Sequence, residues 1–60
     1  MTKYDLVIGD KYNWKSQPER LIYVGRDWTG RWNRFGKVEA PHLIWCEVLD
    51  EDLHMMERTK

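Results

Sequence analysis

The chain has 60 residues, no net charge at neutral pH, one cysteine and a hydrophobic fraction of 42%. This length allows one domain, residues 1–60, and so short a chain buries only about 60% of the surface that it exposes when unfolded. The single Cys46 excludes an internal disulfide, and the apolar residues are too scattered for a membrane span. Because Met1-Thr2-Lys3 leads into a patterned strand rather than an apolar signal segment, we expect a cytoplasmic protein.

Tryptophan and charge are distributed unevenly along the sequence. Four tryptophans are more than so small an interior can hide, so we expect some indole surface to face a partner. Residues 11–37 contain three of them and carry seven basic and two acidic residues, a balance of +5, whereas residues 38–60 carry two basic and six acidic residues, a balance of −4. Either the two segments neutralise each other within the fold, or they form a dipolar surface that steers an oppositely charged partner.

The first half of the chain predicts two strands. Residues 4–8 are rich in β-forming side chains and end at the turn signal Gly9-Asp10, which predicts a first strand. Residues 11–19 are mostly polar and include Pro18, which predicts a long loop or an irregular hairpin. Residues 20–26 form a nearly continuous apolar run bounded by charge, which predicts the central strand.

A hairpin follows the central strand. Asp27 and Gly30 occupy the first and fourth positions of a type I turn, so residues 31–35 are expected to return as the partner strand. Alternation along that strand puts two groups of side chains on opposite faces. One group is Arg31, Asn33 and Phe35, and the other is Trp32 and Arg34.

A third strong strand is predicted over residues 42–48, after a connection that contains Gly36, Ala40 and Pro41. Its side chains Ile44, Cys46 and Val48 share one face and form our expected core.

The last segment, residues 49–60, fits two structures. Asp50 could cap a helix with acids in its first turn and Arg58 near its end. We prefer a single helical turn over residues 50–53 and a short closing strand over residues 54–57, in which Leu53 and Met55 share a face and Met55 is more costly to replace than Met56.

These elements recur at a spacing of about ten residues, which is typical of a small barrel whose last strand covers an open edge. Their order resembles that of SH3-like barrels, which implies an all-β, five-stranded barrel with one short helical turn near the C-terminus. The acidic loop and paired tyrosines of peptide-binding SH3 domains are absent, so proline-rich ligands are not implied. The alternative is an α+β fold with a three- to four-stranded sheet and a C-terminal helix.

Two runs are similar to segments of small accessory proteins of lambdoid phages and prophages: YNWKSQPE (residues 12–19) and WCEVLDEDL (residues 45–53). The resemblance would span most of the chain. It implies a phage or prophage origin, a place in the bacterial host cell and a host-directed role rather than any chemistry.

The sequence favours no catalytic, metal or cofactor site. On a strand, His42 and Cys46 would stand about 13 Å apart, too far for one ion, and with His54 they supply few ligands for zinc. Cys46 has no evident activating base, and the acids of residues 50–52 are typical of a solvated turn. We therefore expect no metal, no cofactor and no enzyme activity.

Recognition remains, through a surface rich in tryptophan and arginine. We favour a host or phage protein as the partner, because tryptophan and arginine are enriched at interface hot spots and zero net charge does not oppose protein binding. Nucleic acid is the alternative, with indoles stacked on bases and basic side chains on phosphates. A homodimer is possible, and no membrane partner is expected. The candidate partner-binding residues are Trp14, Arg26, Trp28, Arg31, Trp32 and Arg34.

Overall fold

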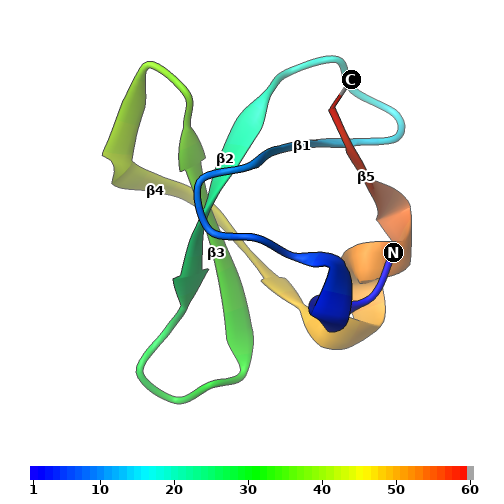
Figure 1. Ribbon diagram of the computed structural model, residues 1–60, viewed down its shortest axis with the longest axis vertical. Coiled ribbons are helices and arrows are strands. Elements are labelled where there is room, and N and C mark those ends of the chain that lie inside the picture. Colours follow the sequence, from blue (N-terminus) through cyan, green and yellow to red (C-terminus); the bar gives the residue numbers. More distant parts are fainter. Residues whose placement is uncertain (60) are drawn as a thin grey trace.

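The protein is a mostly β structure built on one antiparallel sheet of five strands (Figure 1). The computed structural model describes residues 1–59; Lys60, which the charge balance above includes, lies outside the described residues. The strands lie in the order β4-β3-β2-β1-β5, and the sheet is open. The elements are η1 (Lys3–Asp5), β1 (Lys11–Trp14), β2 (Leu21–Arg26), β3 (Trp32–Lys37), β4 (Ala40–Leu49), η2 (Asp50–Met55) and β5 (Met56–Arg58), where η denotes a 3-10 helix.

The expected central strand and its hairpin are confirmed. β2 lies in the middle of the sheet and pairs with β1 on one side and β3 on the other. Asp27 and Gly30 close the turn between β2 and β3 through a hydrogen bond from the Gly30 amide to the Asp27 carbonyl at 3.1 Å. On β3, Asn33 and Phe35 share the buried face, as alternation predicts.

The expected strand at residues 4–8 is wrong. η1 covers the start of this segment, and the first strand is β1, within the stretch expected to be a loop. The hydroxyl of Tyr12 accepts a hydrogen bond from the Val7 amide at 2.9 Å and donates one to the Asp5 carbonyl at 3.2 Å. These bonds hold the N-terminal segment against β1. Tyr12 is fully buried, whereas Val7 and Ile8 of the expected strand are exposed.

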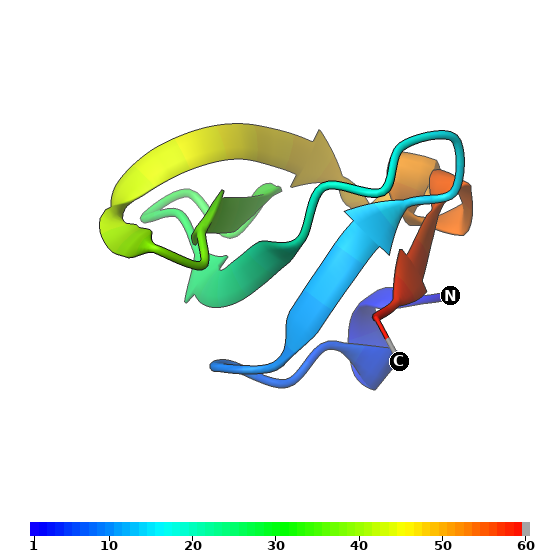
Figure 2. The same cartoon turned by 90° about the horizontal axis from the view of Figure 1, so that it is seen from above.

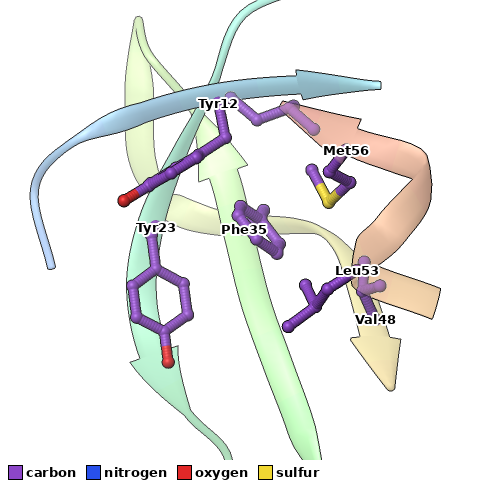
Figure 3. Close-up of a cluster of buried hydrophobic side chains, with 7 residues drawn as sticks. Tyr12, Tyr23, Phe35, Val48, Leu53 and Met56 are labelled. Atoms are coloured by element: carbon purple, nitrogen blue, oxygen red, sulfur yellow. The ribbon is translucent and has the colours of Figure 1, made fainter. Parts of the chain in front are cut away.

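The core is centred on three aromatic rings, which come from β1, β2 and β3 (Figure 3). Tyr12 meets Tyr23 and Phe35 edge-on, with ring centroids 6.5 and 6.0 Å apart, and Tyr23 lies 5.4 Å from Phe35. Six elements contribute to one apolar cluster around these rings: β1, β2, β3, β4, η2 and β5. Its members are Tyr12, Leu21, Tyr23, Phe35, Val48, Leu53 and Met56.

β4 confirms the third strong strand and corrects its core residues. Val48 is buried and Cys46 is half-buried against the cluster, but Ile44 is exposed. Cys46 pairs with Phe35 and Ile44 pairs with Gly36, so Trp45 is an extra residue in a bulge. A bulge shifts the alternation of side chains by one position. Ile44 therefore lies on the opposite face from Cys46 and Val48, although it is two residues before Cys46.

Gly36 allows β4 to cross close over β3. A Cβ atom on Gly36 would lie 2.7 Å from the Pro41 carbonyl oxygen and 2.9 Å from that of Leu43. Both are backbone atoms, so a larger residue at this position would push the two strands apart.

The C-terminal segment agrees with the helical turn and closing strand that we preferred, with two corrections. The turn is the six-residue η2, and the strand β5 begins at Met56, so the C-terminal helix of the α+β alternative is wrong for the described residues. A 3-10 helix repeats every three residues, which puts Leu53 and Met56 on the same buried side. The expected greater importance of Met55 is wrong because Met55 is 43% exposed and Met56 is fully buried.

Candidate functional site

The turn between β2 and β3 presents Trp28 almost entirely to solvent. We call residues 27–31 the hairpin loop; it forms one end of the molecule in Figure 1. Trp28 is 95% exposed, the highest value among the large apolar side chains of the described residues. The fold therefore gains almost no burial from this indole.

The Asp27 carboxylate orders the hairpin loop by accepting hydrogen bonds from residues that follow it in the turn. It accepts hydrogen bonds from the Thr29 hydroxyl at 2.7 Å and from the amides of Arg31 and Trp32 at 3.2 Å each. Desolvation acts to raise the pKa of Asp27, but the hydrogen bonds from Thr29 and Trp32 outweigh it and hold that pKa below its ordinary value. A loop ordered in this way presents Trp28 at a lower entropic cost of binding than a mobile loop would.

A second set of contacts ties the hairpin loop to η2. Arg26 donates two hydrogen bonds to the Asp50 carboxylate, at 2.8 and 3.0 Å, and another to the Gly30 carbonyl. The fully buried Asn33 donates to Asp50 at 2.8 Å and to the Val48 carbonyl at 3.0 Å. Asp50 thus links the loop, β3 and the start of η2.

Asp50 gives the fold a predictable dependence on acid. The hydrogen bond from Asn33 and those from Arg26 hold the pKa of Asp50 below its ordinary value. A carboxyl whose pKa is lower in the folded chain adds stability above its unfolded pKa, and this stability is lost as the pH falls through the folded value. We expect the urea midpoint to fall when wild-type protein is acidified from about pH 5 to about pH 3, and to fall less in Asp50→Asn.

The matched control for this prediction is Asp52→Asn. Asp52 lies two residues further along η2 and has no side-chain hydrogen bond or ion pair recorded among residues 1–59. This variant should keep the acid dependence of the wild type. Equal acid dependence in Asp50→Asn and in the wild type would contradict the assignment of Asp50.

Three of the six predicted site residues come together at the hairpin loop. Trp28 and Arg31 lie on it, and Trp32, 38% exposed, begins β3 next to it. Arg31 has no ion pair recorded among the described residues. These three side chains are therefore the part of the predicted surface that can contact a partner at the hairpin loop.

Two of the predicted arginines are engaged within the molecule. Arg26 binds Asp50, and Arg34 Nε lies 3.3 Å from a Glu47 oxygen across the β3–β4 pair. Both pairs join the basic segment to the acidic one. The uneven distribution of charge along the sequence therefore serves, at least at these two pairs, to neutralise charge inside the fold.

Trp14 lies away from the hairpin loop. The β1–β2 register pairs Tyr12 with Leu21 at the start of β2, and Trp14 follows further in the same direction, while the hairpin loop follows the other end of β2. Trp14 is half-buried against the core. Burial raises the pKa of the Cys46 thiol, and a hydrogen bond with the Trp14 side chain acts the other way.

Sequence reasoning missed the Asn33–Asp50 contact. Alternation along the strand puts Asn33 on the face of Phe35, and a polar residue on a core-facing side signals a buried hydrogen-bonding partner. Nothing in the sequence indicates that this partner is Asp50, 17 residues away.

Over residues 1–59, no group of three or more His, Cys, Asp or Glu side chains is arranged so that it could hold a metal ion. Within the same range, no helix is long and apolar enough to span a membrane.

Comparisons of the chain with protein-family models, with curated proteins and with solved structures found no match. The geometry of the hairpin loop is therefore the basis on which a function is proposed below.

Proposed function

We propose that this protein is a non-enzymatic interaction module that binds a host or phage protein through the hairpin loop, with Trp28 as the principal contact and Trp32 and Arg31 beside it. The observation that carries the proposal is the combination of a fully presented indole and a loop ordered around it by Asp27 and Arg26. A large aromatic side chain that is held rigid and exposed is typical of an interface hot spot.

The structural part of the proposal is that the sheet curls into an SH3-like barrel. Three features support it: β1 pairs with both β2 and β5, η2 lies between β4 and β5, and side chains of β4 and β5 meet in one core. Origin from a phage or prophage and a place in the bacterial cytoplasm stay predictions of the sequence.

Nucleic acid is the second candidate, and the charges around the hairpin loop argue against it. Binding of a phosphate backbone needs several basic side chains near the stacking aromatic residues. Of the arginines considered for this role, Arg26 and Arg34 are engaged with acidic partners, which leaves Arg31 beside Trp28. A single arginine without a recorded ion pair at the hairpin loop, among the described residues, favours a protein surface over a nucleic-acid backbone.

Capture from bacterial lysate tests the class of partner. We expect immobilised wild-type protein to retain a protein partner after nuclease treatment, and Trp28→Ala to lose it. Trp45→Ala is the matched control, since Trp45 is 55% exposed but lies near the far end of β3, beside Lys37. Equal capture by wild type and Trp28→Ala, or no retained protein, would contradict the proposal.

Titration with single- and double-stranded oligonucleotides at two salt concentrations tests the second candidate. We expect no binding at micromolar concentrations. Nucleic acid would replace the protein partner if the affinity were micromolar with a log–log salt slope of roughly −3.5 to −4.5. That slope corresponds to phosphate contacts from the five basic side chains that the nucleic-acid alternative would use: Lys11, Lys15, Arg26, Arg31 and Arg34.

A further inference from the structure

We propose that a basic cleft over β1, β5 and the β1–β2 loop (residues 15–20) binds the diphosphate group of a small phosphorylated ligand. The cleft consists of two adjoining hollows of about 450 and 530 Å³, which share Arg20 and Thr59. Its charged lining residues are Lys11, Lys15, Arg20, Arg58, Asp10 and Glu57. β5 runs beside β1 next to this loop, whereas the hairpin loop follows the other end of β2, so the two sites are separate (Figures 1 and 2).

Strand register brings the lining residues of the basic cleft to one face of the sheet. Continuing the β1–β2 register places Asn13 opposite Arg20, and on its other side Asn13 pairs with Glu57 of β5. Lys11 lies two residues before Asn13, and residues two apart on a strand share a face. The carbonyl of Lys11 accepts a hydrogen bond from the Thr59 amide at 3.0 Å, which holds the end of the chain beside it.

The floor of the basic cleft is fixed by the side chain of Asn13. Its amide nitrogen donates to the Glu57 carboxylate at 3.2 Å and to the Gln17 carbonyl at 3.3 Å. Its oxygen accepts a hydrogen bond from the Thr59 hydroxyl at 2.9 Å. These bonds join β1, the β1–β2 loop and β5, so the cleft is ordered without a ligand and binding costs less entropy.

Positive charge in the basic cleft exceeds negative charge. Of its two acids, Asp10 forms an ion pair with Arg58, and Glu57 accepts the hydrogen bond from Asn13. Three further cations have no ion pair recorded among residues 1–59: Lys11, Lys15 and Arg20. Three such cations around one concave surface repel one another and attract an anion, which relieves that repulsion when it binds.

The arrangement of these cations favours phosphate over carboxylate. A carboxylate is satisfied by the planar fork of one arginine. A phosphate group carries up to two negative charges and three acceptor oxygens, so it accepts hydrogen bonds from several directions. Lys11 lines one hollow, Lys15 lines the other and Arg20 lines both. Two linked phosphate groups, one in each hollow with Arg20 between them, fit this arrangement.

Titration of the purified chain with inorganic diphosphate at low salt, followed by the amide NMR shifts, tests the basic cleft. We expect saturable shifts at Lys11, Arg20 and Thr59, with a dissociation constant on the order of 100 µM. Arg20→Gln should weaken binding at least about tenfold, and because Arg20 is exposed the variant should stay folded. No saturable shift up to about 5 mM diphosphate, or a folded Arg20→Gln chain that binds as tightly as the wild type, would overturn the proposal.

Two further variants separate the basic cleft from net charge. Arg31→Gln removes the same charge at the hairpin loop and should leave the affinity for diphosphate unchanged. Glu57→Gln removes an acid from the cleft and keeps an oxygen for the bond from Asn13, so affinity should rise. Equal losses in Arg20→Gln and Arg31→Gln, or weaker binding by Glu57→Gln, would contradict the site. Circular dichroism establishes that each variant is folded.

Comparison of anions tests the class of ligand. Inorganic phosphate fills one hollow and should bind at least about tenfold more weakly than diphosphate. Equal affinities would overturn the use of both hollows. A hexaglutamate peptide and a single-stranded oligonucleotide should displace diphosphate only at much higher concentrations. If either of them bound more tightly than diphosphate and lost that binding in Arg20→Gln, the cleft would be assigned to an acidic protein segment or to nucleic acid instead.

Discussion

Met56→Lys is expected to unfold the protein, while Met55→Lys should leave it folded. Met56 is fully buried in the core beside Leu53, so lysine there would place an unpaired charge among apolar side chains, a change that costs more than about 4 kcal/mol. A chain of this length has a total stability of only about 3–9 kcal/mol. Urea denaturation followed by circular dichroism measures the difference.

Met55→Lys is the matched control for this prediction, because the two methionines are adjacent and Met55 is 43% exposed. Its free energy of unfolding should stay within about 1 kcal/mol of the wild type. A larger loss at Met55 than at Met56 would mean that the segment alternates as a strand from Leu53 onward and that η2 is misplaced.

Phe35→Ala should have the second large effect. Its ring is fully buried and contacts both Tyr12 and Tyr23, so removing it leaves a cavity at the centre of the core. Truncations of this kind cost about 3–5 kcal/mol, enough to populate the unfolded state. The unfolding free energy in urea gives the value.

Phe35→Leu provides the graded comparison, because leucine refills most of the cavity and should lose less than half as much stability. If Phe35→Ala lost less than about 1 kcal/mol, the aromatic cluster would not be the centre of the core.

Local sequence signals predicted the elements that depend on local chemistry. The apolar run of β2 and the Asp27–Gly30 turn were found because strand burial and turn preference are encoded in neighbouring residues. The strand pattern of β4 was found in the same way. Each of these elements keeps its structure in the fold.

The errors arise where a distant contact or a change of period decides the structure. The segment before Gly9 does not form the predicted strand, and Tyr12 occupies the core instead. The hydrogen bond from the Val7 amide to the Tyr12 hydroxyl could not be predicted from a strand pattern. Ile44 was misassigned because the bulge at Trp45 breaks the alternation. Met56 was misassigned because a 3-10 helix repeats every three residues.

The candidate site was predicted only in part, because some of its residues are neighbours in the sequence and others are placed by distant contacts. The turn chemistry located Trp28, Arg31 and Trp32 together, since they are neighbours along one hairpin. Trp14 was grouped with them by residue type, but its place depends on the pairing of β1, which the sequence did not predict. The hydrogen bond between Arg26 and Asp50 also joins distant segments, so the sequence did not indicate that Arg26 is engaged within the molecule.

The most direct test of the account compares stability and binding in a single variant, Trp28→Ala. Because the indole is 95% exposed, its removal should change the free energy of unfolding by no more than about 0.5 kcal/mol. Affinity for the captured partner should fall by about 2 kcal/mol or more, roughly 30-fold, when both are measured on the same preparation. A Trp28→Ala chain that unfolds, or one that binds the partner as tightly as the wild type, would contradict the central claim.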